Sequence, residues 1–317
     1  MEDVKCRIVR KYHLHLNSHW FTIPLAKAIL GFPVHKDDVV DPNESSMTYQ
    51  ELSSMGVVNL VPIKRTEEYL IQLPYVWVCA IVEDSKDPGM MYWKSMLKYD
   101  EPMYWQNFED FNVKFWALCL SLFCLMGYEK INLKTLCKGA DFSLSFPDVE
   151  VDLPQEDIKL YKLLHQYPVT KTYENNQAKY VDIMEVRNGY INLDLFKNDN
   201  IRSYIGCVFL NVSGAPFDAF GFLNKSSEPA GEICIAQQSK STTTSNVVIN
   251  QGLFNNVYEK VTKAMNVEKK DWALLFLTNA DKKNLSIDDK PNSALVSVEN
   301  FQKFYGYTYT SRAQFAS

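Results

Sequence analysis

Residues 216–240 read PFDAFGFLNKSSEPAGEICIAQQSK, and this stretch decides the expected fold. Residues 217–223 and 232–238 are rich in aromatic and aliphatic side chains, and each run has the length of a strand. The segment between them, 224–231, contains Asn, Ser, Pro and Gly, which favour turns. The pattern predicts two neighbouring antiparallel strands joined by a turn.

Three polar side chains lie at the ends of these two expected strands. Asp218 starts the first strand, and Gln238 and Lys240 end the second. Side chains two apart on a strand face the same way, so the hairpin should bring Asp218 towards Gln238 and Lys240. Oxygen ligands from Asp218 and Gln238 suit Mg²⁺ or Mn²⁺, and a lysine beside them can orient water and stabilise negative charge. The sequence therefore predicts a metal-dependent site for phosphodiester hydrolysis.

Two of these residues also have an interpretation without catalysis. Asp218 can be a turn aspartate that caps its own backbone, and Lys240 can be a solvated lysine at the end of a strand. The spacing of all three residues together favours the site.

The rest of the chain from residue 96 alternates helical and strand patterns. A long buried helix is expected at 105–126, where Phe108, Phe111, Phe115, Leu118, Leu122 and Leu125 recur at three- and four-residue spacing. Helices are also expected at 155–166 and 250–265, with a last helical turn at 301–307, and further strands at 180–186, 189–195, 203–212, 272–278 and 295–298. This order predicts an α/β fold in which one mixed sheet is flanked by helices.

The first 95 residues form a separate lead-in in this interpretation, followed by a nuclease domain over 96–317. A helical segment ends at Gly31, a polar linker follows, and Thr48 and Glu51 form a capping box for a short helix. Two short strands at 57–63 and 69–73 complete a winged-helix-like pattern, and an ordinary α+β packing subdomain is the alternative.

Composition excludes several classes of protein. The 317 residues are 46% hydrophobic and carry a net charge of −5, which is a globular composition without an overall basic coat. Seven scattered cysteines without a CxxC pattern are typical of reduced thiols in a nuclear or cytosolic protein. No apolar signal-peptide region is visible at the N-terminus, and the longest apolar run, 115–126, is too short to span a bilayer, so no membrane partner is expected.

The P-x-D and [E/Q]-x-K pattern resembles the PD-(D/E)xK motif of restriction-endonuclease-like nucleases. From about residue 48 to the end, the chain resembles the C-terminal nuclease region of Crinkler effectors and of retrotransposon hot spot proteins. The stretches that carry this resemblance are MTYQELSSMGVVNL (47–60), YLIQLPYVWV (69–78), YWQNFEDFNVKFWALCLSLF (104–123), APFDAFGF (215–222) and EICIAQQSKST (232–242).

The resemblance implies Mg²⁺-dependent cleavage of DNA, with RNA not excluded. It also implies that Glu109, on the first core helix, is a third metal ligand beside Asp218 and Gln238; a first-turn acid favoured by the helix dipole is the alternative. Gln238 departs from the family, which has Asp or Glu at this place, so the site loses one negative charge.

Partners and location follow from the same resemblance. The helix after the motif places Gln251 and Tyr258 on one side, and with Lys260 and Lys263 they are candidate DNA contacts; a solvated helix face is the alternative. A P-loop NTPase often precedes the nuclease in the family, but no GxxxxGK[ST] motif occurs here. The implied protein is a secreted effector that acts in a host nucleus. The alternatives are a catalytically inactive nuclease fold that binds DNA or a host protein, and a transposon-associated nuclear protein.

Overall fold

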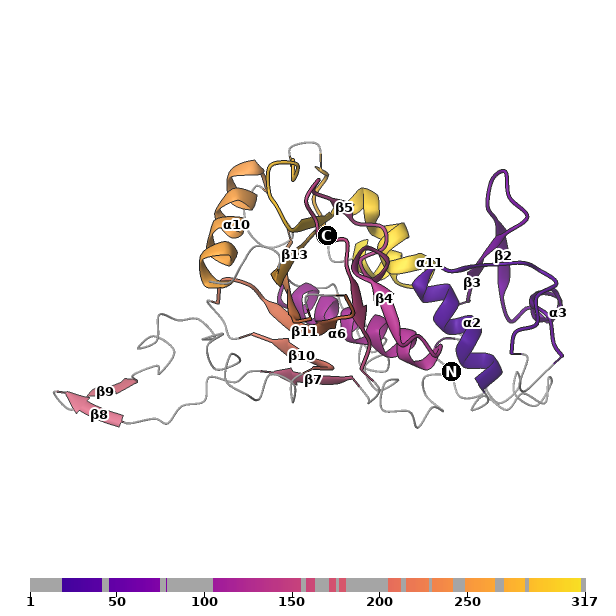
Figure 1. Cartoon of the computed structure of the whole chain (residues 1–317), viewed down its shortest axis with the longest axis horizontal. Coiled ribbons are helices and arrows are strands. Elements are labelled where there is room, and N and C mark those ends of the chain that lie inside the picture. The colour runs from indigo at the N-terminus through magenta and orange to yellow at the C-terminus, as the bar shows by residue number, and fades with distance from the viewer. Residues whose placement is uncertain are drawn as a thin grey trace.

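One mixed β-sheet with helices on both faces is the main feature of the part of the chain that the structure describes (Figure 1). The structure is a computed structural model that describes residues 19–41, 46–74, 78, 105–154, 158–162, 171–174, 177–180, 205–211, 215–227, 230–241, 249–265, 271–282 and 285–314. None of the helices in these ranges has the length and apolar character needed to cross a membrane.

The main sheet has the strand order β4-β6-β11-β12-β13-β14-β5, and β11 also pairs with β10, which in turn pairs with β7. The strands are β4 (Lys130–Asn132), β5 (Asp141–Phe142), β6 (Glu150–Asp152), β7 (Lys159–Lys162), β10 (Cys207–Leu210), β11 (Ala219–Lys225), β12 (Glu232–Lys240), β13 (Trp272–Thr278) and β14 (Ser293–Val296). The predicted hairpin is confirmed, because β11 and β12 pair antiparallel over six residues from Ala219↔Gln237 to Asn224↔Glu232.

The centre of the sheet is parallel and buried on both faces. β13 pairs in parallel with β12 on one side and with β14 on the other. All seven residues of β13, WALLFLT, are buried, as expected for a parallel strand covered by helices on both faces. Its bounds are those predicted from the sequence.

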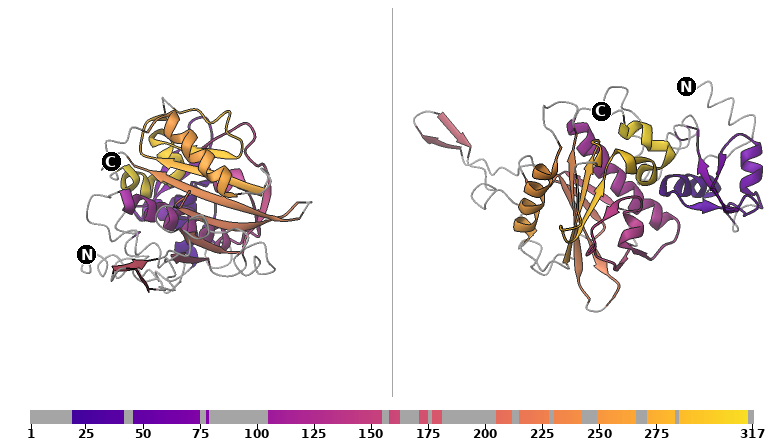
Figure 2. Two further views of the ribbon diagram at one scale, coloured as in Figure 1. Left: turned by 90° about the vertical axis from the view of Figure 1, so that its left-hand side faces the viewer. Right: turned by 90° about the horizontal axis from the view of Figure 1, so that it is seen from above.

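Helices cover the two faces of the sheet, which Figure 2 shows edge-on in its right panel. On one face lie α6 (Trp105–Leu125), α2 (His19–Leu30) and α11 (Phe301–Gln314), and on the other lies α10 (Gln251–Met265). Side chains of β12 alternate between the two cores: Ile233 and Ile235 belong to the α6 side, and Cys234 and Ala236 to the α10 side.

The lead-in contributes α2 and a small antiparallel sheet of β1 (Pro33–Val34), β3 (Tyr69–Gln72) and β2 (Asn59–Pro62) in that order, with α3 (Tyr49–Ser54) before β2. The predicted capping box is confirmed: Thr48 Oγ1 accepts from the Glu51 N–H, and the Glu51 carboxylate accepts from the Thr48 N–H. Gly31 ends α2 with φ +62°, a conformation that glycine adopts without strain.

The first and last helices of the structure pack against each other. α11 changes direction at Gly306, where φ is +65°. A Cβ atom at this position would lie 3.0 Å from the carbonyl oxygen of Ile29 in α2, so only glycine allows this close approach. α2 therefore shares one hydrophobic core with α6 and α11. The proposed boundary near residue 95 lies outside the described residues and stays a prediction.

The predicted helix over 155–166 is wrong at its centre. Residues 159–162 form β7, which pairs in parallel with β10 from Cys207↔Lys159 to Leu210↔Lys162. Four residues of mixed polarity carry no decisive period, and the hydrogen bonds offered by the edge of β10 outweigh the local helical preference. The parts of this expected helix at 155–157 and 163–166 lie outside the described residues.

Other expected elements shift or extend. The last helical turn is the start of the 14-residue helix α11, which follows a 3-10 turn, η4 (Val298–Asn300). The short helix α7 (Leu133–Leu136) and the strands β4, β5 and β6 were not predicted. The strand expected at 180–186 begins at Tyr180, the last residue of β9 (Gln177–Tyr180), and its remaining residues lie outside the described residues, as does the strand expected at 189–195. β9 forms a two-stranded hairpin with β8 (Lys171–Glu174).

Candidate functional site

Asp218 lies beside the end of β12, as its place in the hairpin requires. Its backbone N–H donates to the Gln237 carbonyl at 2.9 Å, which continues the β11–β12 pairing by one residue. Its carboxylate oxygen Oδ2 accepts two hydrogen bonds, from Gln238 Nε2 at 2.5 Å and from the Ser239 N–H at 2.6 Å. The structure therefore brings Asp218 and Gln238 into direct contact across the two strands.

Glu109 and Lys240 share the electrostatic environment of this carboxylate. Burial, followed by the negative charge of Asp218, raises the pKa of Glu109 to about 8, and the positive charge of Lys240 acts in the opposite direction. Burial also raises the pKa of Asp218, against the lowering effects of Lys240 and of the hydrogen bonds from Ser239 and Gln238. The charges of Asp218, just before β11, and of Lys240, at the end of β12, thus act on Glu109 of α6, and the charge of Lys240 also acts on Asp218.

The amide nitrogen of Gln238 faces the carboxylate of Asp218. The side chain is buried, and Nε2 donates to Asp218 Oδ2. An amide oxygen in this position would face a carboxylate oxygen at the same distance, which is repulsive unless a cation lies between them. Gln238 thus holds the carboxylate by donation, and its expected role as an oxygen ligand stays a prediction.

The sequence interpretation missed two polar residues, Ser239 and Asn112, that connect to Asp218 by hydrogen bonds. Ser239 donates its backbone N–H to the carboxylate, and its Oγ accepts from Asn112 Nδ2 of α6 at 2.9 Å. Asn112 was recognisable as an amide in the middle of the apolar helix sequence FEDFNVKFWALCL, and Ser239 as the residue between Gln238 and Lys240. A polar side chain that falls within the buried stretch of a helix requires a hydrogen-bond partner, and that requirement was the available signal.

The donor set of this site fits a small, hard divalent cation. Glu109 and Asp218 are the two carboxylates that could hold the expected cation, and both described hydrogen bonds to Asp218 reach Oδ2. Within the described parts of the chain no three or more His, Cys, Asp or Glu side chains gather into a metal site. Two carboxylates are nevertheless a usual protein contribution for Mg²⁺, which keeps water and substrate phosphate oxygens as its other ligands.

The expected DNA contacts lie on α10, which covers the face of the sheet opposite α6. The amide of Gln251 bonds both backbone groups of Ser286, accepting from N–H at 2.7 Å and donating to the carbonyl at 2.9 Å. The Tyr258 hydroxyl donates to the Pro291 carbonyl at 3.0 Å. These two side chains therefore anchor the loop before β14 to the helix, and only Lys260 and Lys263 of the four candidates are exposed. A role in DNA binding stays a prediction for all four.

Comparison of the whole chain with models of known protein families, with curated proteins and with solved structures found no match in any of the three searches.

Proposed function

We propose that this chain is a Mg²⁺- or Mn²⁺-dependent endonuclease that hydrolyses DNA phosphodiesters, with a site formed by Glu109, Asp218, Gln238 and Lys240. The observation that carries the proposal is the hydrogen-bonded pair of Asp218 and Gln238 at the end of β12, together with the charge interactions that link Asp218 to Glu109 of α6 and to Lys240. Burial raises the pKa values of both acids, and acids with raised pKa values beside a charged partner are typical of catalytic sites.

Each residue of the proposed site has its own role. Glu109 and Asp218 would hold the cation, which supplies Lewis-acid activation of the phosphodiester and of the attacking water when it is bound. Gln238 and the Ser239 N–H fix the Asp218 carboxylate in one orientation. Lys240 orients the water and offsets the negative charge that develops on the phosphate oxygens.

The proposed family is the restriction-endonuclease-like PD-(D/E)xK group, and more narrowly the Crinkler effectors and retrotransposon hot spot proteins. What supports it is the sequence resemblance together with a mixed sheet flanked by helices, whose central hairpin carries the motif. The helix α3 and strands β2 and β3 then correspond to the winged-helix-like lead-in. A secreted effector acting in a host nucleus, sometimes after an upstream P-loop NTPase, is the biological setting that this family implies; a transposon-associated nuclear protein is the alternative within it.

A second candidate function is a catalytically inactive nuclease fold that binds DNA or a host protein. The hydrogen bond from Gln238 Nε2 to Asp218 favours it, because an amide donor here neutralises part of the carboxylate charge without a cation. In this case Gln238, where the resembled family has Asp or Glu, stabilises the metal-free site.

Cleavage of supercoiled plasmid in Mg²⁺ and in Mn²⁺ tests the first candidate against the second. We expect nicking by the wild-type chain and a loss of about a hundredfold or more in Asp218→Asn and Lys240→Met, which remove one charge each. Asp148→Asn and Lys130→Met make the same two chemical changes at exposed residues and serve as matched controls. Equal activity in all five proteins would remove this site assignment. Absence of nicking with retained DNA binding would favour the inactive fold, and a single-stranded RNA substrate tests the nucleic acid preference.

A further inference from the structure

A continuous chain of hydrogen bonds runs from the C-terminal helix to the candidate metal-binding carboxylate. The Tyr305 hydroxyl of α11 donates to Asn112 Oδ1 at 2.5 Å, and Asn112 Nδ2 donates to Ser239 Oγ at 2.9 Å. The Ser239 N–H then donates to Asp218 Oδ2 at 2.6 Å. Three elements that are remote in the sequence, α11, α6 and β12, thus meet in one polar connection.

The three residues that lead to Asp218 in this chain of bonds are all buried. Relative exposure is 0% for Tyr305, 2% for Asn112 and 3% for Ser239. A polar group buried to this extent without a partner lowers the free energy of unfolding by about 1–3 kcal/mol. The hydrogen bonds therefore allow few alternative arrangements. In this chain of bonds the hydroxyl of Tyr305 satisfies the amide oxygen of Asn112, and the amide nitrogen satisfies Ser239.

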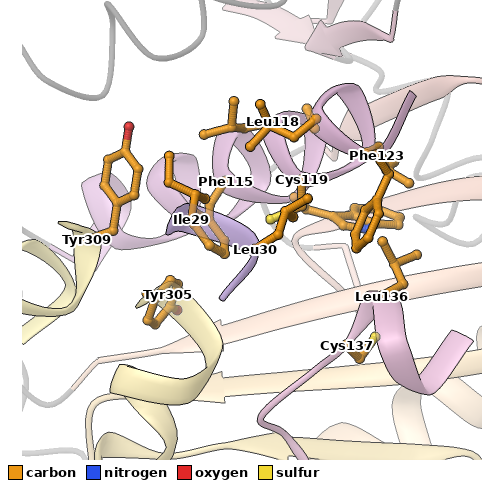
Figure 3. Packing of buried hydrophobic residues seen from close by; sticks show 14 of the residues in the cluster. Ile29, Leu30, Phe115, Leu118, Cys119, Phe123, Leu136, Cys137, Tyr305 and Tyr309 are labelled. Carbon is orange, nitrogen blue, oxygen red and sulfur yellow. The ribbon is translucent and has the colours of Figure 1, made fainter. Parts of the chain in front are cut away.

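The aromatic packing around Tyr305 fixes the far end of this chain. Its ring lies 4.9 Å from the ring of Phe115 and 5.6 Å from that of Phe111, both on α6, measured between centroids. Figure 3 shows Tyr305 among the buried side chains between α6, α2 and α11. Because neighbouring rings pack against the Tyr305 ring on several sides, its hydroxyl has a fixed position, and so does the donor of the hydrogen bond to Asn112.

Asn112 also lies one helical turn after Glu109. Residues three apart on a helix are neighbours on its surface, so the bond from Asn112 to Ser239 fixes the part of α6 that carries Glu109 against the part of β12 that holds Asp218. The same amide therefore acts on both carboxylates: on Asp218 through Ser239, and on Glu109 through the helix.

We propose that Asn112 and Tyr305 are positioning residues that set the separation of Glu109 and Asp218, and thereby the affinity of the site for Mg²⁺. This inference rests on the proposed nuclease function. Neither residue reaches the cation or the substrate. Their effect belongs to the class of outer contacts that orient metal ligands, whose loss typically weakens metal affinity by 10–100-fold.

The decisive variants are Tyr305→Phe, which removes one hydroxyl from the aromatic cluster, and Asn112→Leu, which replaces the amide by an apolar group of similar size. We expect both to raise the Mg²⁺ concentration for half-maximal plasmid nicking by about tenfold, with KM for DNA unchanged and kcat recovered at high Mg²⁺. Tyr309→Phe is the matched control, because Tyr309 lies on the same helix and contacts Phe111 and Phe115. An unchanged Mg²⁺ midpoint in both variants, or the same change in Tyr309→Phe, would overturn the proposal.

A second readout separates this proposal from the proposed function. In the metal-free protein, the backbone amide resonance of Ser239 reports its hydrogen bond to Asp218 whether or not the chain cuts DNA. We expect this resonance to shift in Tyr305→Phe and Asn112→Leu and to stay in place in Tyr309→Phe. If wild type binds Mg²⁺ and the shift occurs but the chain does not nick DNA, the nuclease function fails and the positioning role stands. If the resonance does not move, the positioning role fails.

Discussion

Replacement of Glu109 by glutamine should make the metal-free protein more stable at alkaline pH. Burial and the charge of Asp218 raise the pKa of Glu109 from 4.5 to about 8, so the folded state favours the protonated side chain. For an acid whose pKa is raised by folding, the stabilising contribution is fully present below pH 4.5 and is lost as pH rises through about 8. Glutamine cannot ionise, so the variant should not show this loss.

The size of the effect follows from the same shift. Each pH unit between the two pKa values corresponds to about 1.4 kcal/mol, but Glu109 is only part-buried, and solvent screening reduces the contribution to about 1–2 kcal/mol. The measurement is urea unfolding in EDTA at pH 5, 7 and 9. The free energy of unfolding of Glu109→Gln should exceed that of wild type by little at pH 5 and by about 1–2 kcal/mol at pH 9.

The exposed residue Glu129 provides the matched control, because Glu129→Gln makes the same chemical change away from Asp218. A difference between Glu109→Gln and wild type that is the same at every pH would refute the reasoning. So would a larger stability of wild type at pH 9, since that would mean that the ionised carboxylate is favoured by its surroundings.

Three further variants test other contacts. Gln238→Glu replaces the amide donor to Asp218 by a second carboxylate, so the metal-free protein should lose about 1–3 kcal/mol of unfolding free energy and recover it in Mg²⁺. Urea unfolding with and without Mg²⁺ checks this, and an unchanged stability in EDTA would contradict it. Gln237→Met removes a buried amide oxygen that has no hydrogen-bond partner among the described residues. Thermal unfolding should show that the free energy of unfolding rises by about 1 kcal/mol, with nicking unchanged. A lower stability would show that the amide is satisfied. Gly306→Ala forces φ +65° on alanine and brings Cβ to 3.0 Å from the Ile29 carbonyl oxygen. Urea unfolding should therefore show that the free energy of unfolding falls by about 1–3 kcal/mol. A stability equal to that of wild type would mean that the backbone of α11 relaxes without cost.

Local chemistry made several elements predictable. The capping box at Thr48, the apolar run of β13 and the two strands around Asp218 each carry their signal within a few residues. The opposition of Asp218 and Gln238 followed from the period of two in a strand, since a hairpin of this register places them side by side.

The rest depends on contacts between remote segments. β7 is a strand because β10, nearly fifty residues later, offers an edge to it, and no local pattern encodes that partner. The packing of α2 on α11 depends on Gly306, which lies 277 residues after its contact Ile29. Asn112 was visible as a polar residue in an apolar helix, but its partners, Ser239 and Tyr305, could be identified only from the fold.

The place of Tyr305 has a consequence for the synthesis of the chain. Asn112 and Tyr305 are 193 residues apart, and the hydroxyl that completes the connection to Asp218 belongs to the last helix that the structure describes. A ribosome must therefore translate past residue 305 before this carboxylate acquires its full set of supporting bonds. We expect nascent chains that already contain the β11–β12 hairpin to lack a finished site, so that any cleavage activity arises late in translation and not on the growing polypeptide.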